Sequence, residues 1–307
     1  MTQPQALPLR LGIDWGGTKM EVIALDAASG RELFRKRVAT PRDDYPGCIS
    51  VVRDLVAAAE SAIGTTGTLG LGIPGSLSPA TGLVKNANST WMNGKPLDRD
   101  LEQALARPVR IQNDANCLAV SEATDGAGAG AHLVHAIIIG TGCGSGIAID
   151  GRAHRGANGI GGEWGNIPLP WMREDEFPGP DCWTGHRGTI DRLCSGSGFQ
   201  WDYTQASGET LTGREIVALA RAGNAQAAAS LARYISRLGR AMAMAANLID
   251  PDVFVLGGGM SNVDELYERL PAAMAPFIFS DRYEVPIRKA AHGDSSGVRG
   301  AAWLWND

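Results

Sequence analysis

Two stretches of this chain, offset by 124 residues, share one pattern. Each begins with an apolar strand, turns through Gly and Thr, and continues into a second apolar strand that ends in Asp. The stretches are residues 11–26 and 135–150, and the offset places Gly16 on Gly140 and aligns the two final Asp residues. Solenoid repeats have periods of about 20–50 residues, so this larger separation predicts two halves of related topology.

Both turns are suited to holding phosphate. Turns of Gly and Thr expose backbone N–H groups and allow a ligand to approach closely, which a polyphosphate requires. Neither turn has the GxxxxGK[ST] spacing of a Walker loop. The pattern therefore predicts a nucleotide-phosphate clamp that is built from two separate turns.

Composition narrows the class of protein. A length of 307 residues suits two domains, and a hydrophobic content of 44% supports a large core. A net charge of −5 without a run of Lys or Arg argues against a nucleic-acid partner. The most apolar stretch, 132–149, is interrupted by four Gly residues, which argues against a membrane span. Five Cys residues and an N-terminus without a signal-peptide pattern predict reduced thiols in a cytoplasmic protein.

The alternation of strands and helices predicts an α/β fold. Expected strands are the hairpin 9–26 and residues 32–38, 69–73, 109–112 and 251–256. Expected helices are 45–63, 97–105, 113–124, one or two helices within 214–249, and 296–305. Residues 151–213 contain many Gly, Pro and Trp residues with little periodicity, which predicts an irregular, substrate-facing region.

Asp14 lies between an apolar strand and a Gly-rich turn. A carboxylate there is suited to holding the hydrated magnesium of a nucleotide, because Mg²⁺ prefers hard oxygen ligands and retains its waters. The alternative is a turn Asp that caps its own backbone, and the adjacent turn favours the metal role. Lys19 in that turn is a candidate phosphate contact or a solvated hairpin lysine.

Asp114 follows a strand and opens a helix within the segment Asn-Asp-Ala-Asn, 113–116. A carboxylate at a helix start is a candidate general base for a sugar hydroxyl, a role worth about 10²–10⁴ in rate. The alternative is an ordinary N-cap Asp, which the sequence alone favours.

Three further segments have a functional and a structural interpretation each. Asn88 belongs to a polar cluster before Trp91 and is a sugar ligand or part of a surface loop, since planar amides match hydroxyls that both donate and accept. Glu163, between glycines, is suited to chelating two adjacent hydroxyls or is an exposed loop acid. The Gly-Gly-Gly-Met segment 257–260 follows a buried strand and is a platform for adenine or a turn.

In this order the segments resemble the ROK family of sugar kinases across nearly the whole chain. IDWGGTK (13–19) and GTGCGSG (140–146) resemble the two phosphate loops of the family. NDANC (113–117) resembles the segment with the catalytic Asp. GGEWGN (161–166) resembles the sugar motif GExGH, and LGGGMS (256–261) resembles the adenosine loop.

Three more segments, 40–45, 85–91 and 292–305, resemble the bacterial fructokinase (mannofructokinase) branch. This resemblance implies transfer of the γ-phosphoryl group of Mg-ATP to a hexose, with D-fructose converted to fructose 6-phosphate as the expected reaction. It also implies a homodimer, with hexose and ATP as the small-molecule partners.

The family implies an actin/hexokinase-type (ribonuclease H-like) α/β fold, in which two related domains flank a cleft. The expected N-terminal domain comprises residues 1–120 and the terminal helix, which returns to it within 292–307. The expected C-terminal domain, 121–291, is the larger one.

The resemblance also implies a role for each matching residue. Asp114 is the expected catalytic base, and Asp14 is expected to organise Mg²⁺ through water. The expected sugar contacts are Asn88, Asn113, Asp114, Glu163, Asn166 and Asp191. The expected ATP contacts are Asp14, Gly16, Gly17, Thr18, Lys19, Gly140, Thr141, Gly142, Cys143, Gly257, Gly258, Gly259 and Met260.

The chain departs from the family at its zinc motif. Family members often carry GExGH followed by CxCGxxGCxE, whose His and three Cys bind a structural zinc. The corresponding residues here are Asn166, Cys182, Thr184 and Thr189. A structural zinc site needs four N, S or O ligands, so no zinc is expected.

Two consequences follow from this departure. A replacement zinc site from Cys182, His186 and Cys194 is a minor alternative. Two expected sugar contacts are also altered, because Asn166 replaces the His and Asp191 replaces the final Glu of the motif. These changes predict a weaker or shifted sugar preference with the chemistry retained.

Other functions stay open at this stage. One is a kinase for mannose, glucose or another hexose. Another is a non-catalytic sugar-binding or regulatory ROK protein. A repressor needs a DNA-binding domain, and no helix-turn-helix precedes the first expected strand. A simple sugar-binding protein has no need of a phosphate clamp, so the kinase interpretation is preferred.

Overall fold

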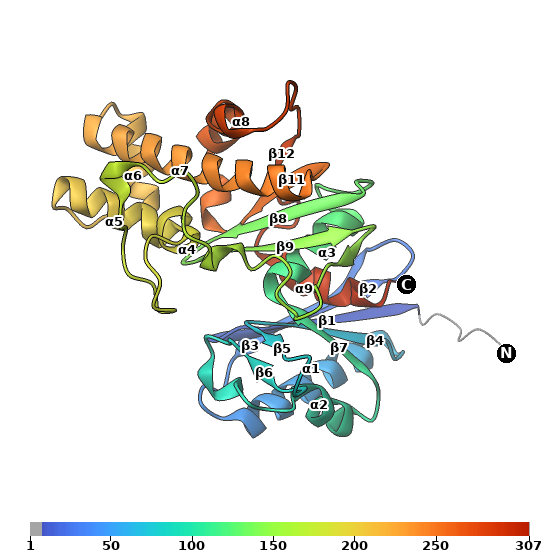
Figure 1. The fold of residues 1–307 in the computed structure, drawn as a ribbon. Coiled ribbons are helices and arrows are strands. Elements are labelled where there is room, and N and C mark those ends of the chain that lie inside the picture. Colours follow the sequence, from blue (N-terminus) through green and yellow to red (C-terminus); the bar gives the residue numbers. More distant parts are fainter. Residues whose placement is uncertain (1–7, 307) are drawn as a thin grey trace.

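The computed structural model describes residues 8–306. Its strands form two five-stranded mixed sheets, one in each of two lobes (Figure 1). The strand orders are β3-β2-β1-β4-β7 and β10-β9-β8-β11-β12. Each sheet has an antiparallel meander on one side and two parallel neighbours on the other. The two halves therefore have the same topology, as the repeat predicts.

The strand bounds agree with most of the predicted strands. The first sheet consists of β1 (Leu9–Trp15), β2 (Lys19–Asp26), β3 (Glu32–Ala39), β4 (Thr68–Ile73) and β7 (Val109–Asn113). The second consists of β8 (Leu133–Ile139), β9 (Cys143–Ile149), β10 (Arg152–Ala153), β11 (Val253–Gly257) and β12 (Ile287–Lys289). A small ribbon of β5 (Ser76–Leu77) and β6 (Val84–Lys85) lies outside both sheets. The short strands β5, β6, β10 and β12 were not predicted, because two or three residues carry little periodicity.

The helices are α1 (Tyr45–Ile63), α2 (Leu97–Leu105), α3 (Asp114–Asp125), α4 (Ile190–Cys194), α5 (Gly196–Ser207), α6 (Gly213–Arg221), α7 (Ala225–Ile249), α8 (Asp264–Met274) and α9 (Ser296–Ala302). The prediction of an irregular region across 151–213 is wrong for α4 and α5. Ser195 caps α5 by accepting from the Gly198 amide at 3.0 Å, and Phe199 and Tyr203 are buried on one face at helical spacing.

The two central hairpins differ by one residue in their turns. Trp15 pairs with Met20 across the first turn, whereas Ile139 pairs with Cys143 across the second. The offset of 124 thus relates β1 to β8, while an offset of 123 relates β2 to β9. Because successive strand residues face opposite sides, the two Asp residues that end the sequence repeats are not structurally equivalent.

Two helices fill the space between the sheets. α3 packs on β8 and β9, α9 packs on β1 and β4, and the two helices pack on each other (Figure 1). A Cβ atom on Gly12 would overlap the backbone of α9, and one on Gly300 would overlap the carbonyl oxygen of Cys117 in α3. In the second lobe, Gly146 allows the backbone of Ala115 the same close approach. Glycine therefore fixes the position of α3 relative to both lobes.

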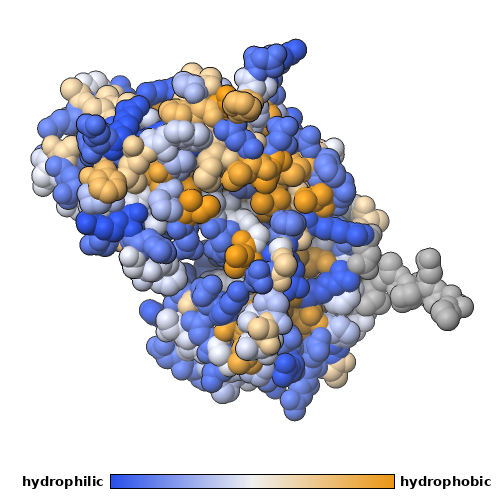
Figure 2. All heavy atoms as spheres, viewed as in Figure 1, coloured by the Kyte–Doolittle hydropathy of each residue, from blue (hydrophilic) through white to orange (hydrophobic). Residues whose placement is uncertain are grey.

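The surface view shows a groove between the two lobes (Figure 2). The predicted domain boundary at residue 120 falls inside α3, so the domain ranges stay a prediction.

Within residues 8–306, no helix combines the length and apolar character needed to cross a bilayer. All five Cys residues are free and buried.

Candidate active site

The first Gly-rich turn is held by hydrogen bonds on both sides. The Gly16 amide donates to the Lys19 carbonyl oxygen at 3.0 Å. Thr40, which follows β3, donates its hydroxyl to the Gly16 oxygen at 2.7 Å and its amide to the Thr18 oxygen at 3.1 Å. The side chains of Thr18 and Lys19 are exposed at the end of the hairpin.

Asp14 lies near the end of β1, in an acidic surrounding. Burial, together with the nearby carboxylates of Asp114 and Glu21, raises the pKa of Asp14 to about 7, while Lys19 and Arg37 act in the opposite direction. A hydrated Mg²⁺ held through water would reduce this repulsion between negative charges, because Mg²⁺ prefers oxygen ligands and retains its waters. The residues present therefore fit the magnesium role predicted for Asp14.

Asp114 begins α3 at the junction of the lobes. The strands β1, β4 and β7 are parallel, so Asp14 and Asp114 lie at the same edge of the first sheet. The Asp114 Oδ1 accepts from the Ala115 amide at 2.8 Å. Burial raises the pKa of Asp114 to about 6; the Ala115 hydrogen bond opposes this effect and the charge of Glu163 adds to it. The Asp114 carboxylate is thus partly buried, mostly ionised at neutral pH, and close enough to Glu163 of the other lobe to be affected by its charge.

The N-cap of α3 is Asn113, and this settles one of the alternatives. Asn113 Oδ1 accepts from the Ala115 amide at 2.9 Å, and its Nδ2 donates to the Gly75 oxygen at 3.3 Å. The interpretation of Asp114 as an ordinary N-cap is therefore wrong. The Asn113 Nδ2 carries two N–H groups and donates one of them to Gly75, so its predicted contact with the sugar stays a prediction for the second N–H.

The remaining predicted sugar ligands come from both lobes. Asn88 follows β6 in the first lobe, while Glu163 and Asn166 lie in the second lobe, and all three side chains are exposed. Lys85 donates its Nζ to the Asn158 oxygen at 3.1 Å, which links the two lobes beside this group. Surrounding protein raises the pKa of Glu163 even though its side chain is accessible to solvent, and Lys85 lowers it.

Asp191 makes a contact within the protein that was not predicted. Its Oδ1 accepts from the Cys143 amide at 2.8 Å, next to the second Gly-rich turn. The Gly140 amide donates to the Gly142 oxygen at 2.9 Å, as Gly16 does within the first turn. Through Oδ1, Asp191 thus couples α4 to the second Gly-rich turn, and its predicted sugar contact stays a prediction.

The second turn opens into a cavity of about 840 Å³ in the second lobe. Gly140 and Thr141 lie on one wall, and Gly259 and Met260 lie on another. Because β8 and β11 are parallel neighbours, the two predicted ATP segments meet at the same sheet edge. Gly257, in contrast, is buried in β11 against Leu118 of α3.

Several residues of this cavity were not predicted, namely Ser197, Gln200, Arg214, Arg221 and Asn262. A local signal exists for the helix that carries two of them. Thr212 and Glu215 fit the spacing of a capping box, and both of its reciprocal hydrogen bonds are present at the start of α6. No short-range pattern in the sequence brings α5, α6 and the 257–260 segment together.

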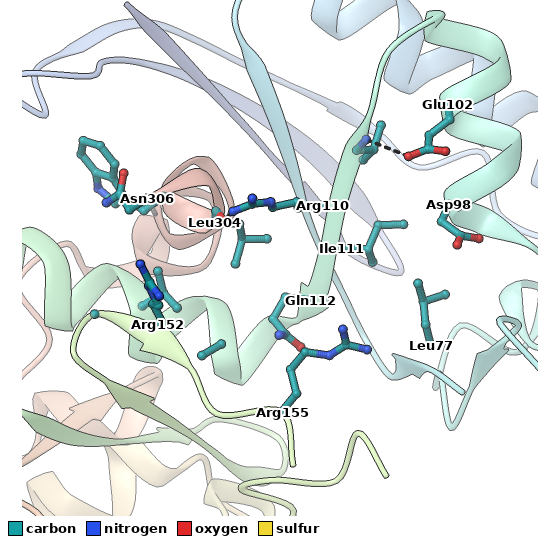
Figure 3. Close-up of a pocket in the computed structure, with 15 residues that line it drawn as sticks. Leu77, Asp98, Glu102, Arg110, Ile111, Gln112, Arg152, Arg155, Leu304 and Asn306 are labelled. Carbon is teal, nitrogen blue, oxygen red and sulfur yellow. Dashed lines mark hydrogen bonds between the residues drawn. The ribbon is translucent and has the colours of Figure 1, made fainter. Parts of the chain in front are cut away.

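A second cavity, of about 460 Å³, lies where β7 and α2 face β10 and the C-terminal residues (Figure 3). Arg110, Arg152 and Arg155 contribute to its wall, and Arg110 donates to the Leu304 oxygen at 2.7 Å. Among the residues that the structure describes, none of the predicted site residues lines this cavity. It is therefore separate from the candidate active site.

The residues at the family's zinc positions do not form a metal site. Thr189 caps α4 by accepting from the Arg192 amide, and the hydroxyl of Thr184 is buried. Cys182 is buried, whereas Asn166 is exposed. Within the described part of the chain, no group of three or more His, Cys, Asp or Glu residues is arranged to hold a metal. The residues present do not fit zinc.

Comparisons with known proteins agree with this geometry. The ROK family model matches residues 10–307. An N-acetyl-D-glucosamine kinase of Haemophilus influenzae is 39% identical over 299 residues, which are 96% of this chain and 98% of that protein. These relatives leave the narrower resemblance to fructokinases unconfirmed, because they carry the name N-acetyl-D-glucosamine kinase.

Solved structures show the same fold. The ROK hexokinase from Thermus thermophilus has a TM-score of 0.85 and 31% identity, covering 96% of this chain and 97% of its own. A ROK family glucokinase from Streptomyces griseus, solved with glucose and AMPPNP, has a TM-score of 0.76 and 28% identity, covering 96% and 98%. The actin/hexokinase-type fold is therefore confirmed, and the chain belongs to the ROK family of sugar kinases.

Proposed function

We propose that this protein transfers a phosphoryl group from ATP to a hexose, with N-acetyl-D-glucosamine as the preferred substrate. The observation that carries the proposal is the partly buried Asp114, which begins α3 at the same sheet edge as Asp14, senses the charge of Glu163 from the second lobe and has a pKa of about 6. A carboxylate in this state is a suitable general base near neutral pH. In this role it takes the proton from the sugar hydroxyl that attacks the phosphorus.

The rest of the chemistry is positioning and electrostatics, as phosphoryl transfer requires. Mg-ATP supplies the phosphoryl group, and the magnesium shields its charge. Asp14 would hold the hydrated ion, and the 840 Å³ cavity would hold the adenosine. Because Gly16 and Gly140 donate their amides within their own turns, we assign the phosphate contacts mainly to Gly17, Thr18, Thr141 and Gly142.

The choice of sugar rests on the relatives. Those that are 38–40% identical over nearly the whole chain are named N-acetyl-D-glucosamine kinases. This favours the amino sugar over the D-fructose that the shorter segments suggested. A sugar-binding or regulatory role is less well supported, because Asp14, Asp114 and both turns are retained. The homodimer, the cytoplasmic location and the domain ranges stay predictions.

The test is ADP release in a coupled assay with Mg-ATP and a panel of N-acetylglucosamine, fructose, mannose and glucose. The proposal predicts the highest kcat/KM on N-acetylglucosamine. A preference for fructose would keep the mechanism and restore the fructokinase assignment. Absence of turnover on every sugar, in protein that still binds ATP, would contradict the kinase proposal.

A further inference from the structure

Residues 167–189 form a long segment between the two expected sugar ligands Asn166 and Asp191. Backbone hydrogen bonds join the two ends of the segment, including one of 2.9 Å from the Ile190 amide to the Ile167 oxygen. Next to these ends, Asp191 accepts a hydrogen bond from Cys143 beside the second Gly-rich turn. The position of this segment therefore sets the position of both altered residues of the sugar motif.

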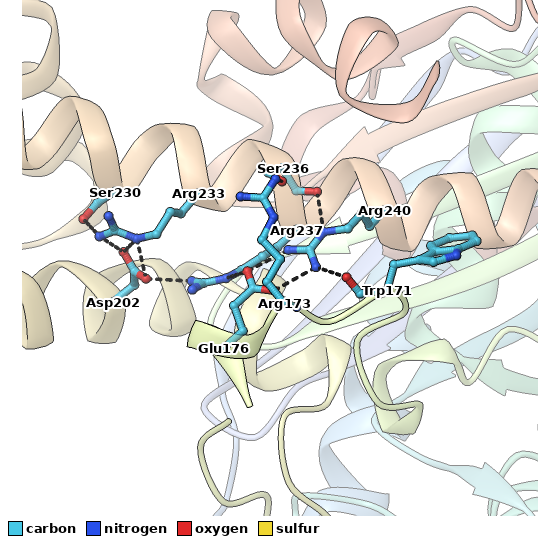
Figure 4. A network of polar contacts seen from close by, with 9 residues as sticks. All are labelled: Trp171, Arg173, Glu176, Asp202, Ser230, Arg233, Ser236, Arg237 and Arg240. Carbon is cyan, nitrogen blue, oxygen red and sulfur yellow. Dashed lines mark hydrogen bonds and ion pairs between the residues drawn. The ribbon is translucent and has the colours of Figure 1, made fainter. Parts of the chain in front are cut away.

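A buried ion cluster fastens the segment to α7. Glu176, in a 3-10 turn (Glu174–Glu176), accepts from Arg237 Nε at 2.9 Å and from Arg240 Nη1 and Nη2 at 2.8 and 2.7 Å. The three side chains are 3%, 6% and 0% exposed, respectively. Figure 4 shows Glu176 reaching from the segment toward the arginines of α7.

The cluster continues into α5 and back to the segment. Arg237 Nη1 donates to Asp202 at 2.7 Å, and Arg233 donates to the same carboxylate at 2.7 Å. Arg240 Nη1 also donates to the Trp171 backbone oxygen at 2.6 Å. The spacing of the arginines, at positions i, i+4 and i+7 of α7, places all three on one helix face.

Glu176 is well suited to a permanent contact of this kind. Burial opposes its ionisation, but hydrogen bonds from Arg240, the Arg173 amide and Arg237 lower the pKa of Glu176 to about 2. The group is therefore a carboxylate across the physiological pH range. Buried charges persist only when they are paired and fully hydrogen-bonded, and this cluster meets that condition.

The residues at the family's zinc positions, one of them Asn166 and the other three within this segment, do not fit zinc, so the segment needs another means of attachment. We propose that the cluster of Glu176, Arg237 and Arg240 holds residues 167–189 on α7 without a metal, and so positions Asn166 and Asp191 for the sugar. Glu176 is thus a positioning residue, which acts through the segment and touches no substrate.

The test is Glu176→Gln, with Glu174→Gln as the matched control. Glu174 is exposed in the same turn, so its replacement leaves the cluster intact. The sugar KM is expected to rise about tenfold in Glu176→Gln, in line with loss of a charge-assisted bond. The kcat is expected to stay unchanged, because Asp14 and Asp114 lie on other elements. Glu176→Asp, which keeps the charge, should restore part of the affinity.

Hydrogen exchange gives a second readout. Amides of residues 167–189 should exchange faster in Glu176→Gln than in the control, and the purified protein should hold less than about one-tenth equivalent of zinc. The sugar KM depends on the proposed kinase function, whereas hydrogen exchange and zinc content do not. Failure of the kinase proposal can therefore be told apart from failure of the proposed role of Glu176. If Glu176→Gln does not fold, Arg237→Lys, which keeps a positive charge, takes its place.

Two results would contradict the proposed role of the Glu176, Arg237 and Arg240 cluster. The first is exchange and sugar KM equal to those of the Glu174→Gln control. The second is about one equivalent of bound zinc, the stoichiometry of a closed structural site.

Discussion

The hairpins β1–β2 and β8–β9 have the same place in their sheets, yet only the first carries a carboxylate near the end of its leading strand. Asp14 occupies that position in β1, and the equivalent residue of β8 is Ile138. The first hairpin lies in the acidic surrounding of Asp114 and Glu21, whereas the second opens into the 840 Å³ cavity. The two halves thus share a scaffold, and the proposed function gives them different roles: the first hairpin would bind the magnesium and the phosphates, and the second would border the nucleoside.

A second difference concerns the approach of α3. Gly146 of β9 has Ile23 as its counterpart in β2, at the offset of 123. Ile23 is buried in an apolar cluster with Val120 and Val298, while Gly146 leaves room for the backbone of α3. The absence of a side chain at position 146 therefore allows α3, the helix that begins with the candidate base Asp114, to lie against both sheets.

Asp14→Asn is the strongest test of the proposal that only the first hairpin binds the magnesium. If Asp14 holds hydrated magnesium as proposed, loss of its charge should lower kcat/KM about 10–100-fold, the usual cost of removing a partner of metal-bound groups. A higher Mg²⁺ concentration should be needed for half-maximal rate. The measurement is the steady-state rate against Mg²⁺.

Ile138→Val is the matched control in the second hairpin. It should lower the free energy of unfolding by about 0.5–1.5 kcal/mol and leave the magnesium dependence unchanged. Equal effects of the two variants on magnesium dependence would remove the proposed difference between the hairpins.

Gly146→Ala tests the approach of α3. The added methyl group would meet the backbone of Ala115, so the free energy of unfolding should fall by about 1–3 kcal/mol. The kcat should fall as well, since Asp114 precedes the displaced residue. Urea denaturation and steady-state kinetics measure both effects. Gly144→Ala on the same strand, where a Cβ would make ordinary contact, is the control, and a Gly146→Ala protein as stable and active as this control would contradict the account.

Arg214→Ala tests the nucleoside side with the smallest expected effect. Arg214 lines the cavity of the second lobe. Its removal should raise the KM for ATP about fivefold, corresponding to one lost hydrogen bond, without changing the KM for the sugar. Arg282→Ala, which removes an exposed arginine paired with Glu284, serves as the control. A change in sugar KM alone would place Arg214 outside the nucleotide site.

Much of the fold could be predicted from local patterns. The helix 45–63 has the predicted bounds, because Asp44 caps its start and Gly64 takes the left-handed conformation at its end. The hairpins and the helix that begins near Asp114 also follow from short-range signals. The register of the second hairpin does not, since a one-residue difference in a turn leaves the hydrophobic pattern almost unchanged.

The site could be predicted only in part, for a related reason. Asp14 and Asp114 stand out because each follows a buried strand, and the structure brings them to one sheet edge. The bond from Cys143 to Asp191 joins residues 48 positions apart, and no local pattern encodes it. The same is true of Arg214, whose place in the cavity depends on how α6 packs.

The most direct test of the account is the kinetics of Asp114→Asn together with the pH profile of the unchanged protein. With a pKa of about 6, Asp114 is ionised above that pH and accepts a proton, and it is protonated below. At saturating Mg-ATP, which would keep Asp14 ionised, the kcat/KM for the sugar should therefore fall about tenfold for each unit below pH 6, and Asp114→Asn should lower kcat about 10²–10⁴-fold while ATP and sugar still bind. A kcat for Asp114→Asn close to that of the unchanged protein, with the same pH profile, would contradict the central claim that this carboxylate is the general base.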